Sequence, residues 1–385
     1  MLALQPLKIR LVGRQCDRDG VQGPGADLIP IHLASGQEGR QGPHRLRPER
    51  AQHRKLHRAG QNRDPGAAHV HGAGHQQRCG LGALRGVRRV RSHDVLAQRL
   101  DEFRGRRVLR ARVHPGECLF NQSYGGDSTF SATLSRDTLS LASDAIPNFA
   151  FGCINSVSGK SVPPQGLLGL GRGPMSLLAQ SGSLYAGVFS YCLPSFKSYY
   201  FSGSLKLGPL GQPSSIKYTP LLKNPHRPSL YYVNLTGVTI GKVLVPLPQQ
   251  LLAFDPLTGA GTIIDSGTVI TRFVEHVYAA IRDEFRAQVK GPFSSLGAFD
   301  TCFAATHEDL APAVKFHFTN LDLTLPVENT LIHSSAGSLA CLAMAAAPNN
   351  VNSVVNVIAN LQQQNLRIVF DVANSRLGIS RELCN

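Results

Sequence analysis

Thr262-Ile263-Ile264-Asp265-Ser266-Gly267-Thr268 is the stretch that decides the fold. A run of β-branched residues leads into a single aspartate, and small residues with hydroxyl groups follow it. Beyond them, apolar residues recur at helical spacing: Val274, Val277, Tyr278, Ile281 and Phe285. The pattern predicts a strand, a tight turn and a helix, with the Asp265 carboxylate at the tip of the turn.

The small residues after the aspartate can hold its carboxylate in place. Ser266 and Thr268 can hydrogen-bond the carboxylate or the neighbouring backbone, and Gly267 allows the chain to bend beneath it. The alternative is an Asx-type turn on a surface loop, which is the commoner fate of an isolated Asp-Ser-Gly. The rest of the chain has to decide between them.

The charge of the chain is unevenly distributed. The 385 residues are enough for two lobes with cores of their own, and the net charge is +15. Residues 1–117 hold 23 Lys and Arg against 10 Asp and Glu, whereas residues 118–385 hold 17 against 15. Only Phe103 among the aromatic residues precedes residue 118. The basic character therefore belongs to the first segment alone.

Residues 1–117 show no sustained strand or helix period and contain too little apolar material for a core, so we predict a disordered or mistranslated Arg-rich segment. Two alternatives are nucleic-acid binding through the arginines and a metal site at His69, His71 and His75 with Cys79. We rank both lower because no finger-like spacing or groove-binding module accompanies them. We therefore expect no nucleic-acid partner, no metal and no cofactor.

From Cys118 onward the sequence is typical of short strands and Gly-rich turns. Apolar and polar residues alternate in 231–236, where Tyr232 is on the polar side, and again in 314–319 and 321–325. Such alternation predicts half-buried antiparallel strands. The clearest helical segment is 274–288. A mostly β, two-lobed protein is expected.

Six of the eight cysteines lie in residues 118–385, and an even set favours an oxidising compartment over cytosolic free thiols. Asn121 and Asn234 fit the glycosylation acceptor pattern, which agrees with secretion. No apolar run approaches the roughly 18 to 20 residues of a membrane span, and the N-terminus lacks the apolar core of a secretory signal. We expect no membrane partner and a monomer.

Several stretches, in one order and spacing, carry a family resemblance: Cys118-Leu-Phe-Asn-Gln-Ser-Tyr-Gly125, Gln165-Gly-Leu-Leu-Gly-Leu-Gly-Arg-Gly-Pro-Met-Ser-Leu177, Phe189-Ser-Tyr-Cys-Leu193, Ile263-Ile-Asp-Ser-Gly-Thr268, Asn356-Val-Ile-Ala-Asn-Leu-Gln-Gln-Gln-Asn365 and Ile368-Val-Phe-Asp-Val-Ala-Asn-Ser-Arg-Leu-Gly378. Together they resemble the pepsin-like aspartic endopeptidases, specifically the plant nepenthesin-like branch. The resemblance covers residues 118–385 and implies a bilobal acid-protease fold. It places the remainder of the N-terminal lobe, with its flap, at 118–205 and the C-terminal lobe at 206–385.

Enzymes of this family carry one Asp-Thr-Gly or Asp-Ser-Gly loop in each lobe, and the two carboxylates share a proton. One takes a proton from a bound water while the other protonates the peptide group. The resemblance makes Asp265 the catalytic aspartate of the second lobe and Ser266, Gly267 and Thr268 its supporting turn. Tyr124 matches the flap tyrosine; the alternative is an ordinary strand tyrosine before a Gly-Gly turn.

The resemblance also implies structural roles. Leu167-Leu168-Gly169 and Val357-Ile358-Ala359 match the apolar segments behind the two catalytic loops, and Gly169 would allow close backbone approach. Two disulfides are implied, Cys302 with Cys341 and Cys192 with Cys384. Cys118 and Cys153 have no evident partners.

One element of the family is missing. No aspartate in residues 1–117 follows apolar residues and precedes Thr-Gly or Thr-Ser, and Asp137 and Asp371 match non-catalytic positions. A lone Asp265 cannot serve as base and acid at one peptide bond. We therefore predict an aspartic endopeptidase-type chain, extracellular (apoplastic) by family, that acts on no peptide bond as written. The alternative is a non-catalytic binding protein that resembles the plant xylanase inhibitors.

Overall fold

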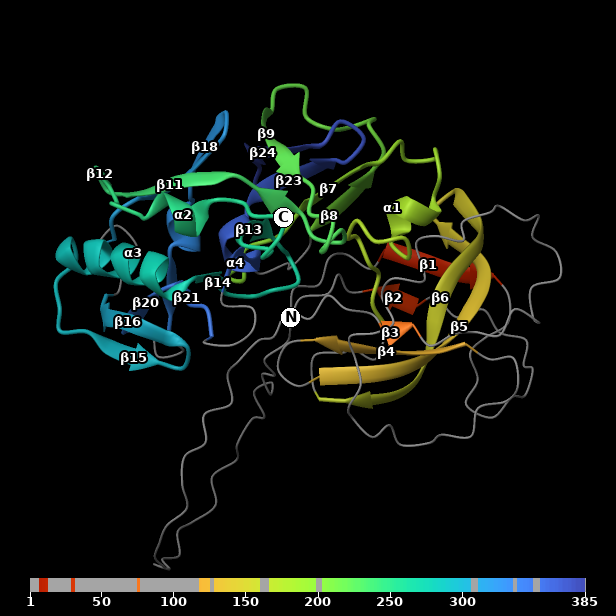
Figure 1. The fold of residues 1–385 in the computed structure, drawn as a ribbon, viewed down its shortest axis with the longest axis horizontal. Helices are drawn as coiled ribbons and strands as arrows, with labels where there is room; N and C mark the ends of the chain where they lie inside the picture. Colours follow the sequence, from red (N-terminus) through yellow and green to blue (C-terminus); the bar gives the residue numbers. More distant parts are fainter. Residues whose placement is uncertain are drawn as a thin grey trace, which may run out of the picture.

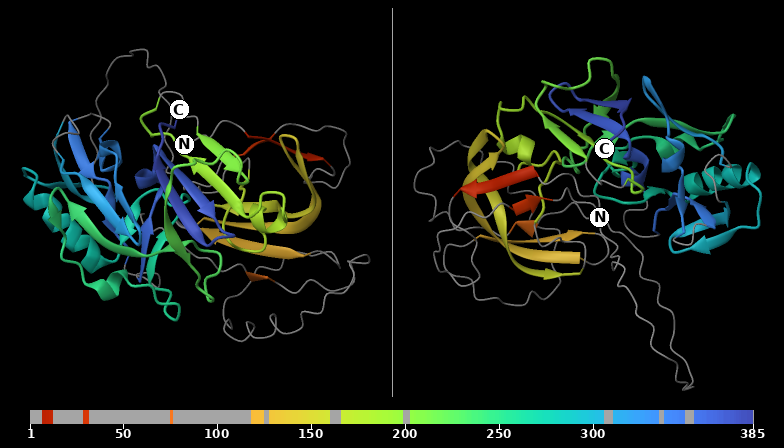
Figure 2. Two further views of the ribbon diagram at one scale, coloured as in Figure 1. Left: turned by 90° about the horizontal axis from the view of Figure 1, so that it is seen from above. Right: turned by 180° about the vertical axis from the view of Figure 1, so that it is seen from behind.

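The computed structural model describes residues 7–12, 29–31, 75–76, 118–124, 128–159, 166–198, 203–305, 311–334, 338–348 and 354–384. Strands dominate these ranges, and they form two groups on either side of a shared central sheet (Figure 1). This confirms the mostly β, bilobal fold that the sequence predicts. The chain is viewed from two further directions in Figure 2, where the yellow strands lie on one side of the molecule and the cyan elements on the other.

The central sheet connects the two halves of the described chain. In order across the sheet, its strands are β21 (Met344–Ala346), β14 (Thr271–Phe273), β22 (Val355–Ile358), β13 (Gly261–Ile264), β10 (Tyr232–Val233), β9 (Lys217–Leu222), β24 (Arg376–Arg381), β23 (Leu366–Asp371), β7 (Val188–Cys192) and β8 (Ser204–Leu207). β23 pairs with the whole of β7, from Arg367 opposite Cys192 to Asp371 opposite Val188. The end of the chain is therefore built into the same sheet as residues 188–207.

Two four-stranded sheets and a helix complete the C-terminal part. The first sheet has the order β12 (Val243–Leu244), β11 (Leu235–Ile240), β17 (Val314–Phe318), β18 (Leu321–Thr324), and the second the order β15 (Ser294–Leu296), β16 (Phe299–Ala304), β20 (Leu339–Leu342), β19 (Leu331–His333). β17 and β18 alternate strictly between buried and more exposed residues, as predicted. The prediction is wrong at Tyr232, which is 0% exposed because its ring packs in a core cluster and its hydroxyl donates to the Gly259 carbonyl oxygen at 2.9 Å.

The expected helix is α3 (Glu275–Ala287), which buries Val277, Tyr278, Ile281 and Phe285 against the main core. One detail differs from the predicted strand, turn and helix. The short strand β14 lies between the turn and α3, because residues 271–273 pair in parallel with β21 and Arg272 pairs with Val357 of β22. Shorter helices are α1 (Leu177–Gln180), α2 (Gln249–Leu252), α4 (Asn360–Gln363) and the 3-10 turn η3 (Val327–Asn329).

The N-terminal part is built on a long hairpin of β5 (Ser128–Leu141) and β6 (Asp144–Ser158), with β4 (Leu119–Tyr124) on the other edge of β5. Three short strands of the Arg-rich segment join this sheet: β1 (Leu7–Val12), β2 (Ile29–Ile31) and β3 (His75–Gln76). The remainder of the predicted disordered segment lies outside the described residues, as do His69, His71 and Cys79. Among the described residues, no group of three His, Cys, Asp or Glu could hold a metal ion.

Both implied disulfides are present. Cys192 and Cys384 join the end of β7 to the end of the chain with their Cα atoms 5.4 Å apart, and Cys302 and Cys341 face each other on β16 and β20. Cys118 and Cys153, for which the sequence shows no evident partners, also take part in disulfides.

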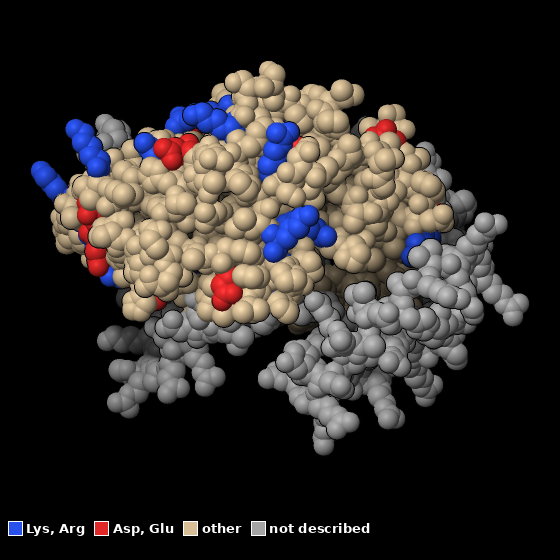
Figure 3. All heavy atoms as spheres, turned by 45° about the horizontal axis from the view of Figure 1, so that its top comes forward, with Lys and Arg blue, Asp and Glu red and all other residues tan. Residues whose placement is uncertain are grey.

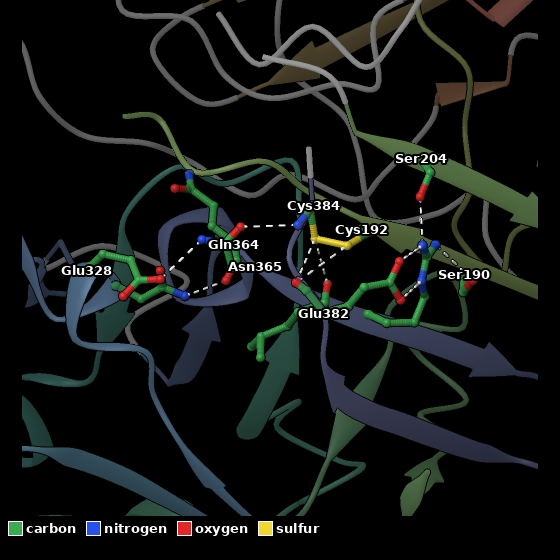
Figure 4. The surroundings of a disulfide bond; sticks show 11 residues. Ser190, Cys192, Ser204, Glu328, Gln364, Asn365, Glu382 and Cys384 are labelled. Carbon is green, nitrogen blue, oxygen red and sulfur yellow. Dashed lines mark hydrogen bonds and ion pairs between the residues drawn. A yellow bond between two sulfur atoms is a disulfide. The ribbon is translucent and has the colours of Figure 1, made fainter. Parts of the chain in front are cut away.

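Figure 4 shows the surroundings of the Cys192–Cys384 disulfide, where Glu382, Ser190 and Ser204 also lie. Glu382 accepts hydrogen bonds from the guanidinium of Arg367, which is only 1% exposed and also donates to the Ser204 hydroxyl at 2.7 Å. The end of the chain is therefore held to β7 by a covalent bond and to β23 by the Arg367–Glu382 ion pair.

The described surface agrees with the near-neutral balance of residues 118–385. On the face in Figure 3 the described Lys and Arg side chains stand apart from one another and most of the surface is uncharged. Of the two predicted glycosylation sites, Asn121 is exposed on β4, whereas the side-chain amide of Asn234 donates to the Thr319 hydroxyl at 2.9 Å. None of the helices in the described ranges is long and apolar enough to cross a membrane.

Candidate active site

Asp265 stands directly after β13, and its position is set by the neighbouring strand. β13 and β22 run parallel with Ile264 opposite Ile358, and the Asp265 amide donates to the Ile358 carbonyl oxygen at 3.0 Å. The β-branched residues before the aspartate favour this buried, extended backbone. The turn therefore begins at a residue anchored in the central sheet.

The carboxylate of Asp265 is held by its own loop. Oδ1 accepts from the Gly267 amide at 2.8 Å, and Oδ2 accepts from the Thr268 hydroxyl at 2.7 Å. The first contact is the Asx-type turn that the sequence allows, and the second is the predicted support by Thr268. Both contacts orient the carboxylate, and each oxygen retains a lone pair for a further partner.

Asn360, which follows the predicted Val357-Ile358-Ala359 segment and for which the sequence predicted no role of its own, holds the loop from behind. The backbone amide of Asn360 donates to the Thr268 carbonyl oxygen at 2.8 Å, and its side-chain amide donates to that of Ser266 at 3.2 Å. Ala359, one residue earlier, donates to the Thr271 hydroxyl at 2.9 Å. The available signal was the five Asn and Gln residues among 360–365, because buried amides require hydrogen-bond partners.

Tyr191 is a second contributor for which the sequence predicted no role. Its hydroxyl donates to Gln363 Oε1, and Gln363 Nε2 donates to the same Ile358 carbonyl that receives the Asp265 amide, at 2.9 Å. Burial, with a smaller contribution from the Asp265 charge, raises the pKa of Tyr191 far above its usual range, while the Ser266 side chain acts in the opposite direction. The phenol therefore stays neutral and serves as a fixed donor.

A cavity of about 550 Å³ opens beside Asp265, Ser266 and Gly267 and extends to β4, β5 and β6 of the N-terminal part. Its described lining is mostly aromatic and aliphatic, and Asp265 is the only carboxylate among the described lining residues. The aromatic lining residues are Phe120, Phe130, Phe149, Phe151, Phe189, Tyr191, Tyr231 and Phe370. The aspartate thus faces a large apolar space.

The two apolar segments predicted to support catalytic loops differ in their surroundings. Ala359, behind the Asp265 loop, is 0% exposed. Gly169, in the corresponding segment of the first lobe, is exposed, and a Cβ built on it would meet no described heavy atom within 4 Å. The Gly169 carbonyl oxygen accepts from the Leu177 amide at 2.9 Å. The close approach of a first-lobe loop to Gly169 stays a prediction.

The remaining predicted residues lie as follows. Tyr124 ends β4 in register with Ser128 on β5, so it stands at the base of a hairpin, while its side chain lies outside the described residues and its flap role stays a prediction. Asp137 Oδ1 accepts from the Thr138 amide, and Asp371 pairs with Arg376 at 2.7 Å. Neither of these carboxylates lines the cavity, in keeping with the non-catalytic positions assigned to them.

Two family models match the chain, and they have the descriptions "Xylanase inhibitor N-terminal" over residues 98–209 and "Xylanase inhibitor C-terminal" over residues 230–381. Among solved structures, the chain is similar to edgp with a TM-score of 0.55 and 22% identity, over 66% of this chain and 71% of that one. The basic 7S globulin from soybean has the same TM-score of 0.55 at 21% identity, over 71% of this chain and 76% of that one. At these identities the likeness shows the fold alone.

Curated relatives are more similar in sequence. Aspartyl protease AED3 from Arabidopsis thaliana is 69% identical over 285 residues, which are 74% of this chain and 64% of the relative. Aspartyl protease 25 from Oryza sativa subsp. japonica is 63% identical over 276 residues, 70% of this chain and 63% of the relative. Aspartic proteinase nepenthesin-1 from Nepenthes gracilis is 34% identical over 280 residues, 69% of this chain and 61% of the relative. The chain thus spans less than two thirds of the length of these relatives.

The Asp265 loop, the bilobal β fold and the two family models agree with these relatives. The chain belongs to the plant pepsin-like aspartic protease family.

Proposed function

We propose that this chain is an aspartic endopeptidase-type protein in which Asp265 is one of the two catalytic carboxylates. The observation that carries the proposal is the hydrogen-bonded loop, in which Gly267 and Thr268 orient the carboxylate and Ile358 anchors its backbone. The names of the relatives, which are aspartyl proteases at up to 69% identity, support the same reaction class. The substrate class is protein or peptide.

In such a reaction Asp265 would accept a proton from a water in the cavity, and that water would attack the peptide carbonyl. A second acid has to protonate the leaving nitrogen, and a carboxylate pair does so by sharing one proton. No second carboxylate lines the described part of the cavity. We therefore propose that the chain as it stands does not hydrolyse peptide bonds.

The test is cleavage of a denatured protein substrate at acidic pH by the full chain and by Asp265→Asn. We expect equal, background-level product from both, unchanged by pepstatin. Cleavage that pepstatin blocks and Asp265→Asn abolishes would refute the proposed inactivity and support the role of Asp265. Cleavage that persists in Asp265→Asn would refute the role of Asp265.

A non-catalytic binding protein on the same scaffold is the second candidate. The descriptions of both matching family models as xylanase inhibitor halves favour it. The intact Asp-Ser-Gly-Thr loop speaks against it, because an inhibitor does not need an oriented carboxylate. Inhibition of a microbial xylanase by the full chain, retained in Asp265→Asn, would favour the binding protein.

We also propose that the protein acts outside the cell as a monomer, without a nucleic-acid or membrane partner. The two described disulfides and the exposed Asn121 sequon support an oxidising, secretory environment. A shift in mass after deglycosylation of the plant-expressed protein, lost in Asn121→Gln, would support this, and sedimentation would test the monomer.

A further inference from the structure

The cavity beside Asp265 has mostly apolar described walls and one carboxylate. At about 550 Å³ it has the size of a small-molecule site, since such sites measure roughly 300–1,000 Å³. Phe189 and Phe370 stack with ring centroids 4.6 Å apart, and Tyr231 lies 4.5 Å from Phe370. Phe120 and Phe130 form an edge-to-face pair on the N-terminal side. Aromatic faces thus come from both parts of the described chain.

Both tyrosine hydroxyls of the described lining are already engaged in hydrogen bonds. The Tyr231 hydroxyl donates to the Leu170 carbonyl oxygen at 2.8 Å, and the Tyr191 hydroxyl donates to Gln363. Asp265 receives one donor on each oxygen, both from its own loop. The described lining contains no Lys, Arg or His to balance its charge. Arg172 stacks on the Tyr231 ring and donates to the Leu222 carbonyl oxygen, but it is not among the described lining residues.

A carboxylate at the wall of an apolar space attracts a cation more strongly than it would in water, because the surroundings screen its charge poorly. The matching ligand has ammonium N–H donors for the free lone pairs of Asp265 and an apolar body for the aromatic walls. An apolar molecule without the charge fills the same volume but leaves the carboxylate without a counter-charge. A ligand with a carboxylate of its own is repelled.

We propose that this cavity binds a small hydrophobic amine, an aryl-alkyl ammonium ion whose charged end contacts Asp265. The inference rests on the oriented Asp265 of the proposed function, but it requires no catalysis. It is therefore tested by direct binding, separately from the peptidase assay.

The experiment is calorimetric titration of the full chain at pH 7 with 4-phenylbutylamine and with 4-phenylbutan-1-ol. The two probes have similar length and the same aromatic end, and they differ in the charge of the other end. We expect the amine to bind at least about tenfold more tightly, the ratio that corresponds to ~1.4 kcal/mol. A ratio near one, or no binding of either probe, overturns the proposal.

Variants locate the site. Asp265→Asn keeps an acceptor for the Gly267 amide and should bring the ratio of the two affinities close to one. Asp322→Asn removes a carboxylate on β18 that does not line the cavity, and we expect it to retain the tenfold preference. An amine preference that survives in Asp265→Asn overturns the proposal.

Gly169→Leu tests the cavity itself. Gly169 lines the cavity, its φ is outside the left-handed region, and a Cβ there meets no described heavy atom within 4 Å. A leucine at this position should therefore occupy part of the ligand volume without straining the backbone. We expect it to lower the affinity for both probes at least about tenfold, which corresponds to a loss of ~1.4 kcal/mol. Unchanged affinity for both probes would place their binding elsewhere and overturn the proposal. If the chain proves to be an active peptidase, the proposed inactivity fails while these titrations still decide the amine site.

Discussion

The amide of Asp265 donates to the carbonyl oxygen of Ile358 at 3.0 Å, and this contact joins two segments that are remote in sequence. This hydrogen bond belongs to the parallel pairing of β13 with β22, and the side chain of Gln363 donates to the same carbonyl oxygen. The backbone at the catalytic-type loop is therefore fixed from the core side, while the carboxylate faces the cavity. Four predictions follow from the way the loop and the chain's end are held.

Thr268→Ala should destabilise the protein through the loss of one donor to Asp265 Oδ2. A hydrogen bond to a charged group contributes about 1.5–3 kcal/mol, and water can replace part of it because Asp265 is only half-buried. We expect the free energy of unfolding in urea at pH 7 to fall by about 1–2 kcal/mol. Thr268→Ser retains the hydroxyl and is the matched control. Equal losses in both variants would contradict the role of the hydroxyl.

Tyr191→Phe should lower the free energy of unfolding although it removes only one hydroxyl group. Tyr191 is 2% exposed and Gln363 is 1% exposed, so the variant leaves Gln363 Oε1 buried without its donor. An unsatisfied buried acceptor costs about 1–3 kcal/mol in the free energy of unfolding. Because the two side chains share one hydrogen bond, their effects should not add: Gln363→Leu should cost less in the Tyr191→Phe background than alone. Strict additivity in the double-mutant cycle would show that they are uncoupled.

The Arg367–Glu382 pair should make stability depend on acidity. Hydrogen bonds from Arg367 hold the pKa of Glu382 below its ordinary value of 4.5. Because the folded pKa is the lower one, this stabilisation is complete above the unfolded pKa and disappears as the pH falls through the folded pKa. Glu382→Gln should therefore lower the unfolding free energy at pH 7 and flatten its decline below about pH 4.5.

Removal of one partner of a buried pair costs about 3–5 kcal/mol, which we reduce to about 1–3 because the Glu382 side chain is 35% exposed. Some decline with acid should remain, since the pKa values of Asp371 and Asp300 are also lowered by their partners. Asp283→Asn, at a carboxylate that is 63% exposed, is the control and should change little. A pH profile identical in Glu382→Gln and the unaltered chain would exclude the ion pair as a source of acid sensitivity.

The two described disulfides should differ in their contribution to the stability of the folded protein. Cys192–Cys384 closes 192 residues of sequence and Cys302–Cys341 closes 39. In the chain-entropy model these loops correspond to about 5 and about 4 kcal/mol. We expect the pair of substitutions Cys192→Ala and Cys384→Ala to lower the melting temperature more than Cys302→Ala and Cys341→Ala, under non-reducing conditions. The opposite order would show that native packing, rather than loop length, decides.

The local part of the site was predictable because its contacts span two or three residues. Asp265 with Gly267 and Thr268 forms an Asx-type turn and a hydroxyl contact, which follow from residue types and spacing alone. Tyr191, Asn360 and Gln363 could not be assigned in the same way. Their contacts depend on the approach of remote strands, which residue spacing does not encode. Strict alternation places Tyr232 on the wrong face because it ignores a core cluster on the second face of the sheet.

The sequence by itself determined the Asp265 turn, the bilobal β class, two disulfide pairs through the family resemblance and the separation of the basic segment from a nearly neutral remainder. Only the tertiary structure decided what surrounds Asp265. The pairing of β13 with β22 fixes its backbone, and the strands of both parts leave an apolar cavity with one carboxylate at its described wall. The physical reason is that hydrogen bonds within a turn are set by neighbouring residues, whereas the charge balance and volume of a cavity depend on side chains brought together from the whole chain.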